Sequence, residues 1–189
     1  MCRKITIVLS FLFLSLYAYA QQPESNARFS VSTDAVTWAN FGTANLGISV
    51  AADKHFSVHA EAQYNPWTFN FKRGQMQNRK QQYSISTKWW PWHVYSGWWL
   101  GAGLQYQEYN HGGVVSQITE EGDATGLALS CGYTLMLTPV LNLDFGFGAW
   151  GGYKWYTKYS CPKCGRIIDQ GKKFFFTGND MSIAMVLLF

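Results

Sequence analysis

The sequence has 189 residues and a formal net charge of +4; 14% of the residues are charged and 17% are aromatic. A chain of this length suits one domain, and its charged fraction lies well below the usual figure of about 25%. The weak positive balance, without helix-turn-helix or zinc-finger spacing, gives no support for nucleic-acid binding. Such a chain must instead cover a large apolar surface.

The first twenty residues have the layout of a secretory signal peptide. Two basic residues precede an apolar run over 5–17, and Ala18-Tyr19-Ala20 supplies a small-x-small cleavage site. The apolar run is too short to span a bilayer, which argues against a first membrane helix. We therefore predict a signal peptide over 1–20 and one mature domain over 21–189.

After the signal, apolar and polar residues alternate in successive segments, as they do along half-buried β-strands. The clearest segment is 56–64, in which apolar residues at even positions oppose Ser57, His59, Glu61 and Gln63. The last segment carries bulky residues at period two. Strands are expected at 28–37, 45–51, 56–64, 82–89, 98–106, 126–135 and 141–155, with a last strand that begins after Phe175 and includes 181–189.

The links between these segments are alternately short and long. Tight turns are expected at 52–54, 91–97 and 138–139, and long polar loops at 65–80, 110–123 and 160–172. No run of about twenty apolar residues follows the signal, so the mature sequence offers no membrane helix. A closed barrel satisfies every backbone group and turns one set of side chains to lipid. We predict an all-β fold, an eight-stranded antiparallel up-and-down transmembrane β-barrel in the bacterial outer membrane, closed by pairing of 181–189 with 28–37.

Aromatic residues gather near both ends of the expected strands, as in the two girdles of a membrane barrel. An aromatic-rich soluble core or a sugar-binding platform is the alternative. The girdle at the 91–97 turn is expected to contain Trp89, Trp90, Trp92, Trp98 and Trp99, and the one near the long loops Tyr64, Trp67, Tyr106, Tyr109, Tyr153 and Trp155. Phe189 resembles the C-terminal aromatic that outer-membrane assembly machinery recognises, so this machinery is an expected partner.

Several short motifs are distributed over nearly the whole mature chain. They are Tyr64-Asn65-Pro66-Trp67, the tryptophan-rich segment 88–99 leading to Gly101-x-Gly103, Cys164-Gly165, and the last strand after Phe176-Thr177-Gly178. In these motifs the sequence resembles an uncharacterised family of small bacterial outer-membrane β-barrel proteins, registered as a domain of unknown function and common in fimbriated Gram-negative bacteria. The resemblance implies an outer-membrane location and no established enzyme activity.

The expected inward-facing positions include Asp34, His59, Glu61, Lys88 and Asp144. An eight-stranded barrel has room for little more than its own side chains. We interpret these residues as a polar cluster that fills the interior, with carboxylates paired to Lys88 and no open pore. Polar interiors are the norm for this architecture, so we expect no catalytic residue and no cofactor.

The catalytic alternative uses the same side of the expected barrel. His59 and Glu61 would act as a base and its orienting carboxylate, with Ser57 or Ser84 as the nucleophile. This arrangement would suit a barrel enzyme that modifies lipid A.

Cys161 and Cys164 form a Cys-x-x-Cys motif in the last expected loop. Outside the cytosol, two nearby cysteines more often form a disulfide than a metal site, and one knuckle is only half of a four-cysteine zinc site. We favour a disulfide over a metal site, and a metal site over a redox centre. His111 could complete a metal site with a partner molecule.

The expected loops carry opposite charges. Lys72, Arg73, Arg79 and Lys80 lie in 65–80 and could contact lipopolysaccharide phosphates, whereas 110–123 carries Glu120, Glu121 and Asp123. A solvated surface is the simpler interpretation of both loops.

From these patterns we expect a monomeric, non-enzymatic outer-membrane barrel that displays extracellular loops, with an envelope-structural or surface-binding role. Its expected partners are outer-membrane lipid and lipopolysaccharide and an extracellular or fimbrial protein. The alternatives are a lipid A-modifying enzyme and a soluble exported ligand-binding barrel.

Overall fold

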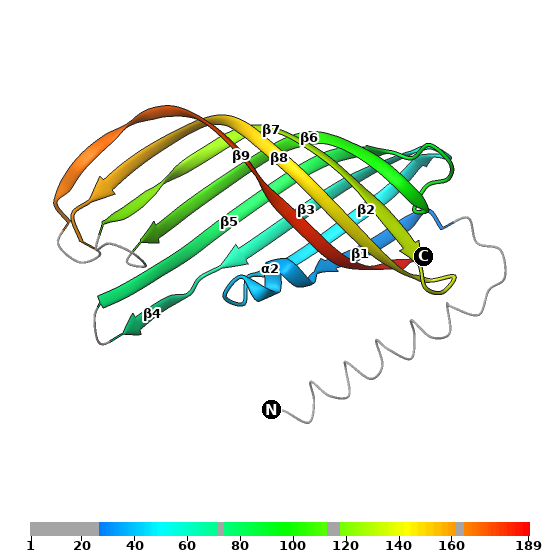
Figure 1. Cartoon of the computed structure of the whole chain (residues 1–189), viewed down its shortest axis with the longest axis horizontal. Helices are drawn as coiled ribbons and strands as arrows, with labels where there is room; N and C mark the ends of the chain where they lie inside the picture. Colours follow the sequence, from blue (N-terminus) through cyan, green and yellow to red (C-terminus); the bar gives the residue numbers. More distant parts are fainter. Residues whose placement is uncertain (1–26, 72–73, 113–117, 162–164) are drawn as a thin grey trace, which may run out of the picture.

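The computed structural model describes residues 27–71, 74–112, 118–161 and 165–189 (Figure 1). The expected signal peptide, together with Lys72, Arg73 and Cys164, lies outside these residues. The strands are β1 (Phe29–Asp34), β2 (Ala44–Asp53), β3 (Phe56–Asn65), β4 (Thr68–Phe71), β5 (Gly74–Trp89), β6 (Gly97–Gly112), β7 (Thr119–Met136), β8 (Leu141–Tyr159) and β9 (Ile167–Leu188), and α2 (Ala35–Ala39) is a short helix. No helix among the described residues combines the length and apolar character that a bilayer crossing demands.

The strands form one antiparallel sheet that closes into a ring. Its order is β1-β2-β3-β5-β6-β7-β8-β9, with β9 paired back to β1, and β4 pairs only with the outer part of β5. Each strand of the ring runs opposite to both neighbours. The predicted all-β, antiparallel, eight-stranded up-and-down ring is therefore confirmed.

The last residues of the chain close the ring, as predicted. Val31 lies opposite Leu187, and the Phe189 N–H donates to the Phe29 carbonyl at 2.9 Å. The cross-strand partners can also be followed from Val31 through β2 and around the ring to β9. They end at Phe176, whereas the direct partner of Val31 on β9 is Leu187. Such a stagger requires the strands to tilt relative to the axis of the ring.

The first strand is shorter than predicted, because α2 begins where residues 35–37 were expected to extend it. Asp34 is the N-cap of α2, and its carboxylate accepts hydrogen bonds from the N–H groups of Val36 at 3.2 Å and Thr37 at 2.9 Å. An aspartate in this position satisfies donors that no helical carbonyl can reach. The chain then runs into β2 instead of rising beside β9.

The three long loops were also predicted wrongly, because most of their residues are strand. Residues 74–81, 107–112, 119–124, 154–159 and 167–173 are the outer ends of β5–β9, and on β5 residues 74–79 extend past the end of β3. We call these five segments, together with β4, the wall. Both faces of the wall carry polar residues, so apolar alternation was absent from the sequence there. In Figure 1 the wall forms the left-hand end of the molecule, opposite the short turns.

Aromatic side chains occupy the interior of the ring in two places. Trp90, Tyr95 and Trp99 form a buried cluster near the short turns, and Tyr109 and Trp150 belong to a second cluster toward the wall. The prediction that Trp90 and Trp99 belong to an outer girdle is therefore wrong. Each follows an outward-facing tryptophan, and neighbouring residues on a strand point to opposite faces.

Candidate functional site

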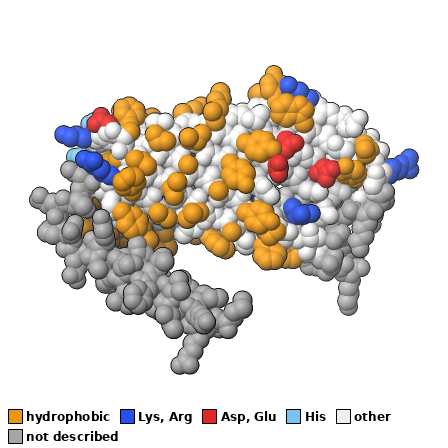
Figure 2. Space-filling model, turned by 180° about the vertical axis from the view of Figure 1, so that it is seen from behind, with side chains coloured by type: hydrophobic (Ala, Val, Ile, Leu, Met, Phe, Trp, Pro, Cys, Tyr) orange, Lys and Arg blue, Asp and Glu red, His pale blue; other side chains and the backbone are white. Residues whose placement is uncertain are grey.

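A band of exposed apolar side chains surrounds the outside of the ring. Figure 2 shows this band on one face of the molecule. Leu127 and Leu129 are 68% and 66% exposed, although they lie in the middle of β7. In the wall the outward positions change to charged residues, among them Arg79 and Glu121. The band includes Ile48, Val58, Ile85, Leu100, Leu104, Leu127, Leu129, Phe147, Ile183 and Met185.

Exposed aromatic residues mark both limits of this band. Trp89, Trp92, Trp98 and Tyr133 lie at the end with the short turns, and Tyr64, Tyr83, Tyr106, Tyr153 and Trp155 lie where the ring meets the wall. Trp67, in the link between β3 and β4, is also exposed, whereas Tyr109 points inward and is buried. The outer surface is thus apolar between two aromatic rows.

The five residues expected to face the interior all line one cavity of about 290 Å³ inside the ring: Asp34, His59, Glu61, Lys88 and Asp144. The remaining lining is rich in serine and glutamine. Figure 1 shows how the strands that carry these residues surround the interior. We call this cavity the inner chamber.

Asp144 joins several strands in the inner chamber. Its carboxylate accepts hydrogen bonds from Trp99 Nε1 at 2.6 Å, Thr134 Oγ1 at 2.8 Å and Lys88 Nζ at 2.9 Å. The Lys88 ammonium also lies 3.8 Å from the centre of the Trp99 ring. A buried carboxylate with three hydrogen-bond donors is well compensated for the loss of water. Its hydrogen bonds link β8 to β5, β6 and β7.

His59 and Glu61 form a second pair, with His59 Nε2 and Glu61 Oε2 3.7 Å apart. Gln63 Nε2 donates to the other carboxylate oxygen at 2.8 Å. Ser57, a candidate nucleophile, is fully buried, and its Oγ accepts a hydrogen bond from Trp90 Nε1 at 3.0 Å. Ser84 lines the inner chamber together with His59 and Glu61.

Gly47 is a residue of the inner chamber that sequence analysis missed. A Cβ at this position would lie 2.3 Å from Ser32 Oγ and 2.8 Å from His59 Cε1. Because Gly47 has no side chain, Ser32 and His59 can project into the space next to it. Its position in an alternating strand, at an inward site between larger residues, was the available signal.

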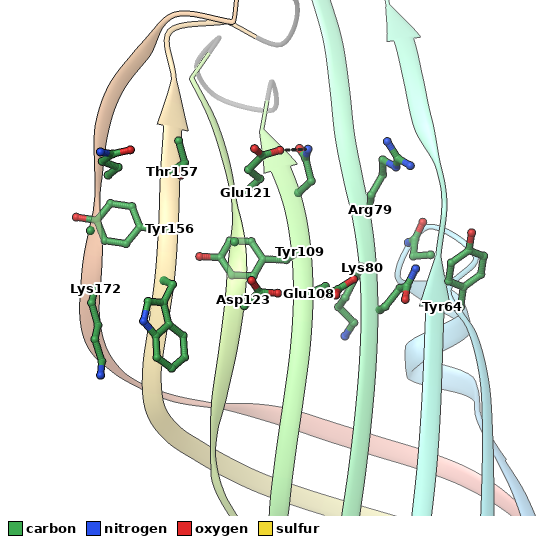
Figure 3. A pocket seen from close by; sticks show the side chains of 17 residues that line it. Tyr64, Arg79, Lys80, Glu108, Tyr109, Glu121, Asp123, Tyr156, Thr157 and Lys172 are labelled. Atoms are coloured by element: carbon green, nitrogen blue, oxygen red, sulfur yellow. Dashed lines mark hydrogen bonds between the residues drawn. The ribbon is translucent and has the colours of Figure 1, made fainter.

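A larger cavity, of about 800 Å³, lies at the wall (Figure 3). We call it the vestibule. Residues of β3 and β5–β9 line it, and by the alternation of side chains Lys80, Tyr109 and Tyr156 project to its inner side. Figure 3 shows Arg79 and Glu121 nearer the free end of the wall than Glu108 and Asp123. Lys80 lines both cavities, which places the vestibule directly next to the inner chamber.

Glu120 is the centre of an ionic cluster inside the wall. Its Oε1 accepts hydrogen bonds from Lys154 Nζ at 2.7 Å and Tyr109 OH at 2.8 Å, and Lys158 Nζ lies 3.8 Å from Oε2. Burial alone would raise the pKa of Glu120, but the hydrogen bonds from Lys154 and Tyr109 outweigh it and lower the pKa. Burial, together with the bond to Glu120, raises the pKa of Tyr109, and burial lowers that of His111. The sequence placed Glu120 in a loop, so its partners were not predictable.

The sequence over residues 5–189 matches the family described as "Protein of unknown function (DUF3575)". The chain belongs to the DUF3575 family. The expected resemblance to a family with a domain of unknown function is thereby confirmed. A search of curated proteins found no match.

The cysteines of this DUF3575 protein lie in different settings. Cys131 is exposed on β7, among the outward-facing residues of the apolar band. Cys164 lies outside the described residues, so a disulfide or metal site formed with Cys161 stays a prediction. Among the described residues, no group of three or more His, Cys, Asp or Glu side chains is arranged to hold a metal ion.

Proposed function

We propose that the protein is a non-enzymatic β-barrel of the bacterial outer membrane whose wall stands outside the lipid as a binding surface. The observation that carries this proposal is the band of exposed apolar side chains around a closed ring. Monomeric soluble proteins rarely expose apolar patches of more than a few hundred Å². Lipid is the environment in which such a band is favourable.

The interior and the backbone agree with a lipid environment. A closed ring pairs its backbone groups between strands, which is what a bilayer demands of a β-structure. The inner chamber holds the charged groups, including Lys88 and Asp144, and the apolar side chains point outward. Polar inside and apolar outside is the arrangement of membrane barrels and the reverse of a soluble core.

The height of the band also suits a membrane. Trp98 and Tyr106 mark its two limits on β6, and at about 3.4 Å per residue they lie about 27 Å apart along the strand. With a strand tilt of about 40°, this becomes about 20 Å along the axis, close to the typical apolar height of about 25 Å. Aromatic residues at both limits are typical of membrane interfaces.

A binding role is supported by the wall rather than by long loops. The wall carries charged residues outside, the vestibule inside, and the Glu120 cluster that holds its strands together. In the inner chamber, Lys88 and Asp144 are paired with each other. Ser57 lies outside the lining of that chamber, and its hydroxyl accepts a hydrogen bond from Trp90. These pairings support a structural interior over a lipid A-modifying site.

The proposal is tested by fractionation of cells that produce the full chain. We expect the protein in the outer-membrane fraction, released by detergent but not by high salt. We also expect heat-modifiable gel migration, which reports a closed barrel. Recovery of the protein as a soluble periplasmic species would overturn the proposal and favour an exported ligand-binding barrel.

The absence of enzyme activity is tested separately in the same cells. Lipid A from cells that make the protein should have the same mass spectrum as lipid A from cells that make His59→Ala. A modification of lipid A that depends on His59 would establish the enzyme instead.

A further inference from the structure

Within the described residues, one side of β9 has no neighbouring strand over most of its length. β1 pairs with β9 only from Leu188 to Ala184, and then turns into α2. From Ile183 back to Ile167, no strand of the described chain pairs with β9 on the side that faces away from β8. In Figure 1 the orange end of β9 lies at the rim of the wall, and the strand becomes red as it runs along the ring. We call the side of β9 over 167–183 that faces away from β8 the open edge.

The chain itself covers the first part of the open edge. The Ile183 N–H donates to Asp34 Oδ1 at 2.7 Å, and α2 packs beside β9. Amides alternate between the two sides of a strand in step with the side chains. Ile183 points outward and directs its amide to this side, so Phe174 and Phe176, which also point outward, direct theirs to the open edge.

The side chains next to the open edge are strongly apolar. Phe174 is 61% and Phe176 72% exposed, and Phe174 packs against Tyr153 with ring centres 5.7 Å apart. Natural sheets often protect an edge with a lysine. Here the Lys172 ammonium lies over the rings of Tyr153 and Trp155, at 4.4 and 4.9 Å, and so is turned onto the outer face of the wall.

Neither environment of the wall suits an uncovered edge of this kind. In lipid, unpaired backbone groups would have no hydrogen-bonding partner. In water, a strand edge flanked by exposed phenylalanines is a template for pairing with another chain. Both cases favour an added strand.

We propose that the open edge binds an extended segment of another polypeptide, which adds to β9 as an antiparallel strand and continues the line of β1. This proposal rests on the proposed function, since it uses the wall as the binding surface. Strand addition of this type takes its affinity from backbone hydrogen bonds and its specificity from alternate side chains. The bound segment carries apolar residues against Phe174 and Phe176 and acidic residues near Lys172 and Lys173.

A second copy of this chain fits the open edge poorly. Two copies in one membrane are related by rotation about the membrane normal, so both β9 strands would descend from the wall. Two such strands run in the same direction, so they cannot form an antiparallel ladder. Because each strand is tilted to the barrel axis, the two also cross at an angle. The occupant is therefore a different polypeptide that rises along β9 from the ring toward the wall.

The test uses the purified full chain in detergent micelles and a synthetic peptide, Glu-Val-Thr-Val-Glu-Val-Thr-Val, capped at both ends. We expect the peptide to protect the amides of Phe174 and Phe176 from hydrogen exchange. The same peptide with N-methyl groups on alternate residues lacks the required donors and should give no protection. No protection by the unmodified peptide at millimolar concentration, or equal protection by both peptides, would overturn the proposal.

Two variants identify the edge as the binding site. Phe176→Pro removes a donor that faces the open edge and leaves the β8 ladder intact, so we expect about tenfold weaker peptide binding from the loss of one hydrogen bond and one ring. Lys172→Glu should also weaken binding. Lys54→Glu makes the same change in the turn between β2 and β3, away from the wall, and should not. Unchanged binding by Phe176→Pro would contradict the assignment.

Heat-modifiable migration and outer-membrane extraction are measured for the same variants. Both should match the unmodified chain, because Phe176→Pro keeps the hydrogen bonds between β9 and β8 and the two charge changes alter exposed side chains. If the peptide gives no protection while the protein is still extracted from the outer membrane, only the proposal that the open edge binds a strand is overturned. A soluble protein would overturn the proposed membrane location.

Discussion

Asp34 is the residue at which the ring changes from strand to helix. Its carboxylate caps α2 and accepts the Ile183 N–H at 2.7 Å, and it is buried. We predict that Asp34→Ala lowers the free energy of unfolding by about 1–3 kcal/mol, since a helix cap and a buried hydrogen bond are lost together. Asp34→Asn keeps an oxygen acceptor and a preferred cap residue, and should lose less.

Denaturant titration of both Asp34 variants, followed by tryptophan fluorescence, measures this difference. The unmodified chain is the reference. An unfolding midpoint for Asp34→Ala equal to that of the unmodified chain would show that the carboxylate contacts contribute nothing to stability.

Gly47 sets the space available in the inner chamber. A methyl group at this position would meet Ser32 Oγ at 2.3 Å and His59 Cε1 at 2.8 Å, so both side chains would have to move. We predict that Gly47→Ala destabilises the ring by roughly 1–3 kcal/mol, because the added methyl group displaces both side chains from their positions. Gly171→Ala is the matched control, because its nearest neighbour, Tyr156 OH, lies at 3.6 Å, an ordinary contact distance.

The measurement is the temperature at which heat-modifiable gel migration changes. We expect a lower temperature for Gly47→Ala and no change for Gly171→Ala. A normal transition temperature for Gly47→Ala would mean that Ser32 and His59 are free to rearrange.

At the scale of elements, the sequence predicted the strands that have one apolar face and missed those that have none. β3 alternates Val58 and Ala60 with His59 and Glu61, so its two faces differ. In the wall, the outward pair Asn110 and Glu121 is followed by the inward pair His111 and Glu120, so both faces of the sheet are polar. Strand pairing there follows from the register of neighbouring strands, which no single segment of sequence displays.

α2 and the tryptophan pairs show two further limits of sequence analysis. The cap formed by Asp34 was visible as an aspartate before Ala35, but the apolar alternation of β1 obscured it. Alternation itself predicts that Trp89 and Trp90 face opposite sides, as do Trp98 and Trp99. The polar residues of the inner chamber were identifiable because they stood at inward positions of clearly alternating strands.

The wall should loosen as the pH falls. The pKa of Glu120 is lowered from 4.5 in the folded state, so its contribution to stability is present above pH 4.5 and is lost as the pH falls through the lower folded value. The pKa of His111 is lowered from 6.5 by burial, so folding disfavours its protonated ring and stability also falls below pH 6.5. Both groups therefore act in the same direction.

Hydrogen exchange at pH 7 and pH 4, corrected for intrinsic rates, measures this loosening. We predict a several-fold loss of protection for the amides of 119–124 in the wall, and a smaller change for 127–133 of the same strand in the ring. Glu120→Gln removes the titrating carboxylate and should remove the part of the loss that occurs below pH 4.5. Equal losses in both segments of β7 would contradict a local effect.

At the scale of the whole molecule, the ring depends on its last residue in two separate ways. The Phe189 N–H donates to Phe29 O, and its carbonyl accepts from Arg28 N, both at 2.9 Å, so the backbone of Phe189 completes the β1–β9 ladder. Its side chain is the terminal aromatic that we expect the outer-membrane assembly machinery to recognise. Deletion of Phe189 removes both features, whereas Phe189→Ala removes only the ring.

We predict that both changes reduce the amount of heat-modifiable protein in the outer membrane, because each removes the aromatic signal. Deletion should have the larger effect, since it also leaves backbone groups of β1 unpaired at an edge that lipid cannot satisfy. Phe189→Tyr keeps the ladder and an aromatic ring, and should assemble normally. If Phe189→Ala also assembles normally while the deletion fails, closure of the ring alone explains the last residue, and the assembly-signal hypothesis is wrong.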